Sequence, residues 1–299
     1  RCNKAEWQWV YQDNPGGSKS IICISNEGRV VAHFGATFHY AVIEGKNVKI
    51  GYCRDAFSHP KVRSVMKNRF GLFVQTAQFL FMNSELKEDR SFFYGFPSPI
   101  SLRLGAIQLG YLEGKNWVRL TYDTQKKVSD ISNLYGFLSS INKFGEEFDQ
   151  LWSKREKVVK AAVIHDKSFL SWRFPLQEKR NYWVWTFTPY LRQEMEGYVI
   201  FSHDKHKAVL LDLHFPTDSR MCLDFWMQIV EKLRWNGIQM IDTWLSLNHP
   251  DLMKLSALGF IKASLPEETK FGFRVFQSGP QWEYLNENFC FTIADSDLY

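Results

Sequence analysis

A strand that runs into a basic turn and then into a helix constrains this chain more than any other feature. An apolar run predicts the strand over 48–58, and His59 and Pro60 end it because proline cannot continue a strand's hydrogen bonding. The turn carries the basic side chains Lys61, Arg63, Lys67 and Arg69. Free N–H groups and the positive dipole end of the following helix favour an anion there. The sequence therefore predicts a phosphate-binding site over this turn.

The composition fits a two-domain protein with an anionic ligand. At 299 residues the chain exceeds a usual single domain, and 45% hydrophobic and 16% aromatic residues suffice for two cores. The net charge of +5 suits an anion, but the absence of a lysine-arginine tract argues against nucleic acid. No apolar run approaches the roughly 20 residues of a membrane span. We therefore expect no nucleic-acid partner and no membrane association.

The cysteines predict a reducing compartment and no metal site. The chain has five, none at the C-x-x-C spacing of zinc or redox sites: Cys2, Cys23, Cys53, Cys222 and Cys290. Reduced and mostly buried thiols in a cytoplasmic protein are the prediction. The sequence starts at Arg1 and enters a Trp-rich segment at once, so we expect an N-terminal segment to precede it.

Two halves of the chain predict the same order of elements. In the first half we expect strands over 21–24, 30–43 and 48–58, a helix over 67–83, a strand over 92–94, a helix over 98–108 and a strand over 117–122. In the second half we expect strands over 182–188, 196–202 and 208–215, a helix over 220–235, a strand over 238–244 and a helix over 249–257. A repeat of about 150 residues indicates a duplicated domain rather than a solenoid.

The predicted fold class is therefore α/β with a mixed sheet and α+β character. Antiparallel meanders and β-α-β crossovers occur together in each half. We expect a first domain over 1–125, a helical connection over 126–160 and a second domain over 161–299.

Six short segments carry a resemblance to a known family. They are Asp55-Ala-Phe-Ser-His-Pro-x-x-Arg63, Phe70-Gly-Leu-Phe73, Tyr94-Gly-Phe-Pro-Ser98, Leu109-Gly-Tyr111, Leu170-Ser-Trp-Arg-Phe174 and Leu258-Gly-Phe260. In order and spacing they resemble the GNAT acyltransferase superfamily, in the tandem form with two GNAT-like domains. The resemblance implies transfer of an acyl group from acyl-CoA, as co-substrate and without a metal, to a primary amine.

The resemblance also implies where acyl-CoA binds. The backbone of Ala56, Phe57 and Ser58 would hydrogen-bond pantetheine, and one N–H would stabilise the thioester oxyanion. The CoA pyrophosphate would lie on the following turn, held by Arg63, Lys67, Asn68, Arg69, Phe70 and Gly71. The sequence departs from the family pattern because Met66 stands where a glycine is expected. We therefore expect a longer or reshaped turn.

A second departure concerns the acid that protonates the departing thiolate. Many family members have a Tyr four residues before the Gly of the Leu-Gly-Phe/Tyr element, and here those positions are Ala106 and Leu255. Either another group serves or the thiolate leaves unassisted, which a thiol with a pKa near 8 to 9 permits.

Three residues are candidates for the base that deprotonates the amine. Asp55 comes first because it directly precedes the thioester site, and His33 and His39 on the neighbouring strand follow. Each has a structural alternative, Asp55 as a strand-end or ion-pair residue and each histidine as a core residue. Asp295 and Asp297 near the end of the chain form an acidic tail that either folds back into a cleft or is solvated.

The second half is expected to shape the acceptor pocket rather than to bind CoA. Between 216 and 220 it has no glycine and it has the acidic Asp218, so we expect one CoA site. Trp172 is suited to stacking on a ring and Arg173 to pairing with a phosphate, although both suit a core or interface equally well. The further substrate-binding candidates are Tyr94, Phe96 and Ser98.

The acceptor is predicted from charge. Tandem GNAT-like enzymes are similar to proteins that acylate aminoglycosides, peptides and nucleotide-linked amino sugars. A basic, aromatic-rich chain favours the nucleotide-linked amino sugar, and such an activity fits bacterial surface-polysaccharide synthesis. No identifiable base accompanies Cys53, so we expect direct transfer in a ternary complex. A catalytically silent binding module with the same fold remains the alternative from another class. The oligomeric state is left open.

Overall fold

The computed structural model describes residues 4–63, 71–84, 86, 90–126, 133–176, 182–192 and 194–297. The chain divides into two compact units that exchange segments. The first unit comprises Arg1–Lys115 and Pro266–Asn288, and the second comprises Asn116–Leu265 and Phe289–Tyr299. The predicted division at 125 and 160 differs from these units because residues 266–288 return to the first one.

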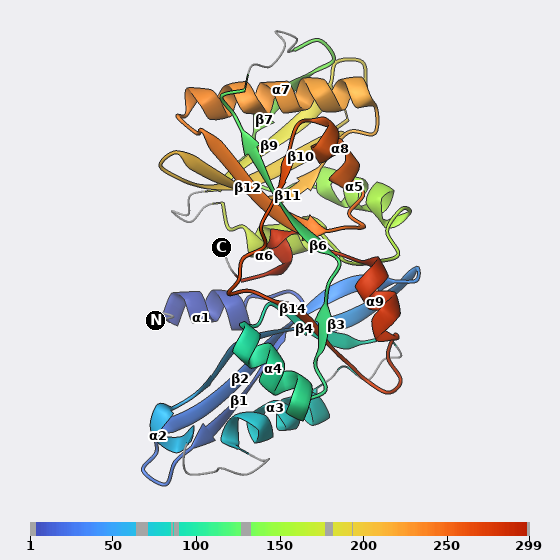
Figure 1. Cartoon of the computed structure of the whole chain (residues 1–299). Helices are drawn as coiled ribbons and strands as arrows, with labels where there is room; N and C mark the ends of the chain where they lie inside the picture. The colour runs from blue at the N-terminus through green and yellow to red at the C-terminus, as the bar shows by residue number, and fades with distance from the viewer. Residues whose placement is uncertain are drawn as a thin grey trace. The chain divides into compact units, whose positions relative to one another are not determined.

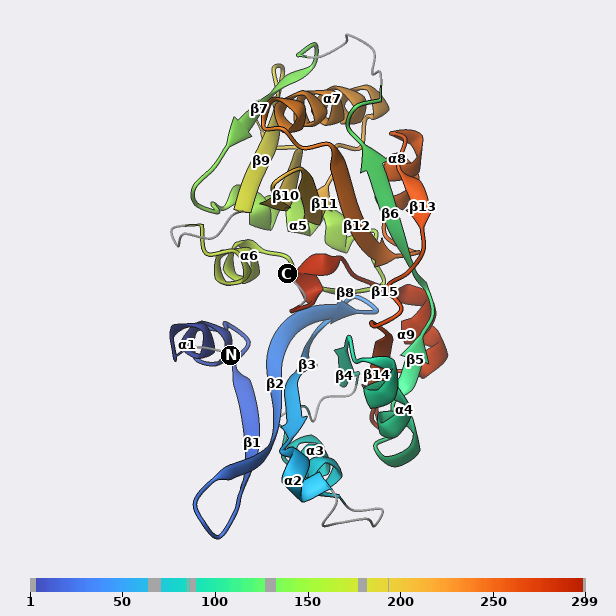
Figure 2. The same ribbon diagram turned by 60° about the vertical axis from the view of Figure 1, so that its left-hand side comes forward.

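The first unit is a mixed sheet with helices on it. Its strands are β1 (Ser18–Ile24), β2 (Val30–Ile43), β3 (Lys46–Ser58), β4 (Phe92–Gly95), β5 (Leu112–Gly114) and β14 (Phe271–Val275). Its helices are α1 (Lys4–Tyr11), α2 (Pro60–Arg63), α3 (Leu72–Asn83), α4 (Pro99–Gln108) and α9 (Trp282–Asn288). Figure 2 shows the long strands β2 and β3 side by side, with β1 along β2.

The strand directions make this sheet mixed. β2 pairs antiparallel with β1 and with β3, and β14 pairs antiparallel with β4 and with β5. β3 and β4 are parallel, as expected for strands joined through a helix. β14 comes from residues far along the chain, which explains why segment 266–288 belongs to this unit.

Helix α3 covers one face of the first sheet. Its buried residues Val74, Ala77 and Leu80 recur at helical spacing. They pack with Phe34 of β2 and Phe93 of β4 in one apolar cluster. Full burial of a side chain of this size contributes about 1.5–3 kcal/mol, so the stripe fixes the helix on the sheet.

The second unit repeats the plan of a mixed sheet with helices. Its strands are β6 (Trp117–Asp123), β7 (Gly136–Ser140), β8 (Ala161–Val163), β9 (Tyr182–Pro189), β10 (Gly197–Asp204), β11 (Lys207–His214), β12 (Met240–Ser246), β13 (Ile261–Ala263) and β15 (Phe289–Cys290). Its helices are α5 (Glu147–Glu156), α6 (Lys167–Arg173), α7 (Ser219–Trp235), α8 (Leu252–Ala257) and the 3₁₀ helix η1 (Ile293–Asp295).

The main sheet of the second unit has the order β13-β6-β12-β11-β10-β9-β7. β11 and β12 are parallel and the other neighbours in this order are antiparallel. Figure 1 shows α7, in orange, lying along this sheet. The helix begins where the carboxylate of Asp218 accepts from the N–H groups of Arg220 and Met221, and its buried face includes Phe225, Trp226 and Ile229. The expected α/β class with two mixed sheets is confirmed.

One predicted segment differs in its secondary structure. Part of 126–160, expected to be helical, is strand β7, whose polar Ser139 and Ser140 obscure the period-2 pattern. Near the end of the chain β15 stops at Cys290, and η1 follows with a capping box. In this box the Thr292 hydroxyl accepts from the Ala294 N–H and the Asp295 carboxylate accepts from the Thr292 N–H.

A buried imidazolium holds the C-terminal segment within the second unit. His165 Nδ1 lies 3.0 Å from Asp212 Oδ2, and His165 Nε2 lies 2.9 Å from Asp295 Oδ1. Carboxylates only accept, so both ring nitrogens donate and the ring is charged. Burial lowers the pKa of His165, but the charges and hydrogen bonds of Asp212 and Asp295 outweigh it and raise the pKa to about 10. Asp212 also accepts from Tyr198 at 2.8 Å and from Thr292 at 3.1 Å.

In the described part of the chain, no helix is long and apolar enough to cross a bilayer.

Replacing His165 is expected to destabilise the second unit strongly. His165→Gln leaves two buried carboxylates without a cation, so the free energy of unfolding should fall by about 3–5 kcal/mol at pH 6. Because the folded pKa is raised, the contribution is complete below pH 6.5 and is lost as the pH rises through about 10. Urea unfolding between pH 6 and pH 10 measures both effects.

The control for this variant is Arg29→Ala, which removes an exposed ion pair with Glu27. It should change the free energy of unfolding by less than about 1 kcal/mol at any of these pH values. A His165→Gln protein as stable as the control would contradict a charged His165.

Candidate functional site

The site begins where β3 and β4 separate. Their parallel pairing covers only Gly51 with Phe93 and Tyr52 with Tyr94. At Gly95 the backbones are still close, since a Cβ there would lie 3.3 Å from the Cys53 carbonyl oxygen. Beyond this point β3 continues to Ser58 with β2 as its only paired neighbour among the described strands. The residues predicted to bind pantetheine, Ala56, Phe57 and Ser58, therefore lie in the part of β3 beyond its pairing with β4.

A β-bulge lies in this open part of β3. Arg54 is opposite Gly35 and Phe57 is opposite His33, so Asp55 and Ala56 face a single residue of β2. Asp55 has a φ of 50°, the left-handed region that aspartate tolerates better than most residues. Bulges re-aim side chains and backbone groups next to active sites. The bulge thus lies at the start of the segment that the sequence predicts to bind pantetheine.

The carboxylate of Asp55 is held by two donors. Tyr11 Oη donates to Asp55 Oδ2 at 2.6 Å, and Arg54 Nε donates to the same oxygen at 3.1 Å. Burial and the hydrogen bond to the Asp55 carboxylate raise the pKa of Tyr11 well above its ordinary value, so the phenol stays protonated. Arg54 also lies over the Tyr11 ring, 5.9 Å from its centroid. Asp55 is still 44% exposed in its side chain.

His33 is bound to the backbone of the bulge. Its Nδ1 lies 2.6 Å from the carbonyl oxygen of Asp55. The ring stacks on Phe57 at 5.8 Å between centroids and 18° between planes, and it meets the Tyr11 ring edge-on at 6.2 Å. The structure therefore brings two of the three predicted bases, Asp55 and His33, into one cluster.

The turn after α1 places Tyr11 in this cluster. Asn14 Nδ2 donates to the carbonyl oxygens of Gly17 and Phe38, and Ser18 Oγ donates to the Tyr11 carbonyl oxygen. Tyr11 reaches Asp55 across Gly35, where a Cβ would lie 2.4 Å from Tyr11 Oη. Any side chain at position 35 would displace the phenol.

The third predicted base lies elsewhere. His39 is buried, its Nε2 is 3.2 Å from Thr37 Oγ1, and its ring packs near Tyr52 and Tyr94. It is six residues from His33 along β2, which is roughly 20 Å in a strand. The structure therefore does not bring His39 to the bulge. The predicted substrate residue Tyr94 is buried beside it.

The predicted pyrophosphate turn is described in part. Gly71 is the N-cap residue of α3, whose first turn contains no acidic residue. The backbone of Arg63 ends α2. Lys67, Asn68, Arg69 and Phe70 lie outside the described residues. Helix α3 therefore begins at Leu72, later than the start at 67 that the sequence predicts, and α2 lies between β3 and α3 in the chain.

The remaining candidates in the first unit, Phe96 and Ser98, follow the end of β4. The separation of β3 and β4 beyond Gly95 is called the gap below. Phe96 stacks on Phe271 with 5.0 Å between the ring centroids. Ser98 caps α4, accepting from Ser101 N at 3.2 Å. Both follow the last paired residue of β4.

The surroundings of Cys53, at the end of the β3–β4 pairing, disfavour its thiolate. Burial raises the pKa of its thiol to about 12, against the opposing effects of a hydrogen bond with Tyr111 and the charge of Arg274. Thiolates, not thiols, are the nucleophiles of covalent catalysis. A covalent relay through Cys53 therefore has no support in its surroundings.

Trp172 and Arg173 lie inside the second unit. Arg173 donates from Nε to the Ala294 carbonyl oxygen at 2.9 Å and from a terminal nitrogen to the Ser296 carbonyl oxygen at 2.7 Å. Trp172 is 8% exposed. The Arg173 side chain thus joins α6 to the C-terminal segment, whereas Trp172 packs on Phe169 of the same helix, and a contact of either residue with substrate stays a prediction.

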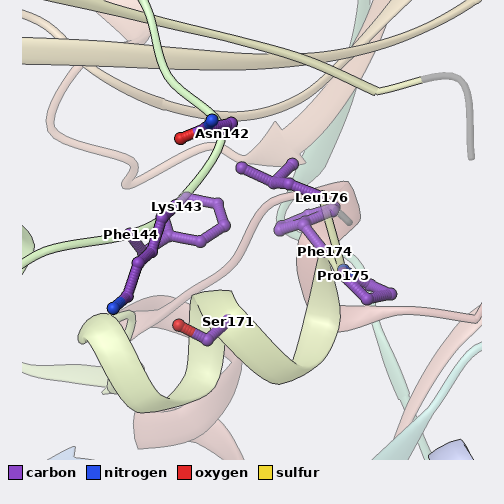
Figure 3. Close-up of a pocket in the computed structure, with 7 residues that line it drawn as sticks. All are labelled: Asn142, Lys143, Phe144, Ser171, Phe174, Pro175 and Leu176. Atoms are coloured by element: carbon purple, nitrogen blue, oxygen red, sulfur yellow. The ribbon is translucent and has the colours of Figure 1, made fainter. Parts of the chain in front are cut away.

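A cavity of about 240 Å³ lies beside α6 in the second unit. Figure 3 shows Ser171 on the helix below it, with Lys143 and Phe144 on one side and Phe174 and Leu176 on the other. It is smaller than most ligand sites. Within the described ranges, no cluster of histidine, cysteine or acidic side chains is arranged to hold a metal ion.

Comparison with solved structures identifies the architecture. A probable N-acyltransferase of unknown function from Enterococcus faecalis shares 14% identity over 91% of this chain and 65% of its own length, with a TM-score of 0.66. A GCN5-related N-acetyltransferase from Anabaena variabilis shares 13% identity over 90% and 64%, with a TM-score of 0.64. The fold is that of tandem GNAT proteins.

An N-myristoyltransferase from Saccharomyces cerevisiae, solved with bound myristoyl-CoA, has a similar fold. It shares 10% identity over 91% of this chain and 74% of its own length, with a TM-score of 0.59. This chain spans slightly less than two thirds of the length of the first two GNAT structures. No protein-family model and no curated protein matches the sequence.

Sequence reasoning missed Tyr11, the residue that holds the Asp55 carboxylate. The two are 44 positions apart, so no local pattern connects them. The one available signal is Gly35, because a glycine inside a strand often marks a close approach by another group.

The Tyr11–Asp55 hydrogen bond is expected to contribute measurably to stability. A double-mutant cycle of Tyr11→Phe and Asp55→Asn should give a coupling energy of about 1 kcal/mol or more, because hydrogen bonds to charged groups are the stronger class. Gly35→Ala should abolish the coupling by displacing the phenol. Urea unfolding of the four proteins gives the value.

The matched control is Tyr40→Phe, because Tyr40 is half exposed on the same strand as Gly35. Its free energy of unfolding should stay within about 0.5 kcal/mol of the parent protein. A zero coupling energy between Tyr11 and Asp55 would show that the bond does not persist in solution.

Proposed function

We propose that this protein transfers an acyl group from acyl-CoA to a primary amine, and that the amine belongs to a nucleotide-linked amino sugar. The observation that carries the proposal is the open edge of β3. It combines a strand that continues beyond its pairing with β4, a bulge at Asp55 and a helix N-terminus at Gly71, the last two within 17 residues of sequence. Each part has a role in holding a thioester of CoA.

The parts fit acyl-CoA in sequence order. An extended pantetheine chain can pair with a free strand edge as an added strand does. The N–H groups at the start of α3 suit a pyrophosphate, and no acidic side chain opposes it in the first turn. Pantetheine joins the pyrophosphate to the thioester, so with the pyrophosphate at α3 the thioester would lie at the bulge end of β3, where a backbone N–H of Ala56, Phe57 or Ser58 would stabilise the oxyanion. The likeness to a solved N-myristoyltransferase with bound myristoyl-CoA supports the same co-substrate.

Direct transfer in a ternary complex follows from the chemistry of the gap. The buried Cys53 thiol has a pKa of about 12, so it is not an acyl carrier near neutral pH. The amine would attack the thioester carbon itself, and the N–C bond would form as the C–S bond breaks. Asp55 and His33 are close enough to the bulge to act on the amine, whereas His39 is not.

The acceptor class rests on charge and aromatic content. The net charge of +5, with 11 Trp, 12 Tyr and 25 Phe, favours an anionic acceptor with rings over a polycationic aminoglycoside. An aminoglycoside or peptide acceptor remains the alternative for the same reaction. The predicted contacts with the acceptor stay Trp172, Arg173, Tyr94, Phe96 and Ser98. The predicted biological setting stays bacterial surface-polysaccharide synthesis.

Thiol release tests the reaction and the acceptor together. The protein is incubated with acetyl-CoA and longer acyl-CoAs against nucleotide-linked amino sugars, aminoglycosides and peptides. We expect free CoA to appear only with an amine present, and fastest with a nucleotide-linked amino sugar. Release with an aminoglycoside or peptide instead would keep acyl transfer and replace the acceptor. Initial-rate plots that give parallel double-reciprocal lines would contradict the ternary complex.

No release with any acceptor, together with no heat of acyl-CoA binding in calorimetry, would favour the silent binding module. The same fold supports that outcome, since fold does not fix function. Acyl-CoA binding without release would contradict the proposed acceptors only.

Charge reversal at Arg69 is expected to weaken acyl-CoA binding by more than tenfold, or about 1.4 kcal/mol. The reason is the predicted contact between this basic turn and the pyrophosphate. Calorimetry with acetyl-CoA compares Arg69→Glu with Arg192→Glu, an exposed arginine of the second unit. Equal affinity of the two variants would contradict the pyrophosphate assignment.

A further inference from the structure

We propose that His33 is the residue that takes the proton from the attacking amine, and that the Asp55 carbonyl and the Tyr11 phenol position it. The inference rests on the acyl transfer proposed above. It assigns different roles to two residues that the sequence ranks in the opposite order, with Asp55 first. The assignment follows from which atoms of the cluster already have hydrogen-bond partners.

One oxygen of the Asp55 carboxylate, Oδ2, already accepts from two donors. It accepts from Tyr11 at 2.6 Å and from Arg54 at 3.1 Å, and a carboxylate oxygen has two lone pairs. A proton on that oxygen would have to displace one of the two donors. The carboxylate therefore serves to hold Tyr11 and Arg54 rather than to receive a proton at that oxygen.

The tautomer of His33 follows from its partner. A carbonyl oxygen can only accept, so the 2.6 Å contact with the Asp55 carbonyl requires a proton on Nδ1. In the neutral ring the other nitrogen, Nε2, then has a free lone pair. No described residue hydrogen-bonds to Nε2, and the ring is partly exposed. Nε2 is thus a ready proton acceptor.

The ring is fixed where an amine would arrive. Phe57 stacks on one face of His33 and the Tyr11 ring meets it edge-on, so the imidazole cannot turn freely. His33 lies opposite Phe57 in the strand register, next to the bulge residue Ala56. The acyl group is proposed to lie on the backbone of the same residues. A base and an oxyanion donor on adjacent positions are what the reaction needs.

The charges around His33 are balanced. β3 presents the Asp55 carboxylate and the Arg54 guanidinium, which pair with each other, and α1 presents the neutral Tyr11 phenol. β1 places Ile22 opposite His33, which adds no titratable group. The ring therefore faces one paired acid and one paired base.

The proton balance of the step is complete. The acceptor ammonium gives one proton to His33 Nε2, and the neutral amine attacks the thioester carbon. The N–C bond forms, the C–S bond breaks, and the CoA thiolate takes a second proton from the attacking nitrogen. The products are an amide, free CoA thiol and a charged His33, which returns its proton to solvent.

Nitrogen NMR tests the tautomer without any turnover. Long-range proton–nitrogen spectra of the protein at about pH 8.5, where an ordinary histidine is neutral, should show His33 protonated on Nδ1. His59 is an internal control for the other tautomer. Its Nδ1 accepts from the Lys61 N–H at 3.3 Å, so the proton of the neutral ring should be on Nε2. His33→Gln supplies the signal assignment. A proton on Nε2 of His33 instead of Nδ1 would overturn the proposal.

Kinetics test the role itself. His33→Ala should lower kcat by about 100-fold or more, leave acyl-CoA affinity unchanged in calorimetry, and regain part of its rate with added imidazole. Asp55→Asn keeps the backbone carbonyl and should lose less than about tenfold. His206→Ala, an exposed histidine of the second unit, should match the parent protein.

The outcomes separate this assignment from the proposed function. A parent protein that releases thiol, with His33→Ala nearly as active and Asp55→Asn severely impaired, would overturn His33 and keep acyl transfer. A parent protein that releases no thiol with any amine would overturn acyl transfer, and His33 with it.

Discussion

The early end of the β3–β4 pairing is the constraint on which the first unit depends. Parallel strands usually continue side by side, and backbone groups left without a partner are costly once they lose water. Here β4 turns away after Gly95, where Ser98 starts α4, while β3 continues for six residues beyond Tyr52. The gap is therefore built into the chain rather than opened by a ligand. A strand edge kept open in this way suits an extended molecule that brings its own hydrogen-bond donors and acceptors.

The bulge makes the open edge chemically specific. A left-handed residue other than glycine costs about 1–2 kcal/mol, and three contacts offset that cost at Asp55. Its carbonyl accepts from His33, and its carboxylate accepts from Tyr11 and Arg54. The same conformation that interrupts the ladder thus determines where the His33 ring lies. The strained backbone conformation of Asp55 is therefore stabilised by His33 of β2 and Tyr11 of α1, in addition to Arg54 of β3 itself.

The sequence predicts those parts of the site that depend on residues close together in the chain, and not the contacts between distant segments. Strand periodicity places β2 over 30–43 as observed, and the register set by the β2–β3 turn holds as far as Gly35 opposite Arg54. The bulge then shifts the pairing by one residue and places His33 opposite Phe57, which the turn alone does not predict. The return of 266–288 to the first unit and the short strands β5, β13 and β14 have too few residues to show a period. The contact of Tyr11 with Asp55 depends on how α1 docks, which no sequence period encodes. Candidates at 67–70 remain predictions from the sequence.

The second unit shows why the duplicated plan yields one open edge rather than two. Its parallel strands β11 and β12 also stop pairing early, after Val209 and Asp242. Beyond these residues the C-terminal segment bonds to β12: Phe291 N–H donates to the Ser246 hydroxyl, and Ser246 N–H donates to the Phe291 carbonyl oxygen. Thr292 donates to Asp212 of β11, and the His165 imidazolium joins Asp212 to Asp295. The start of α7, where a phosphate would bind, is occupied by the Asp218 carboxylate. These contacts and the acid-capped helix support the proposal of a single CoA site in the first unit.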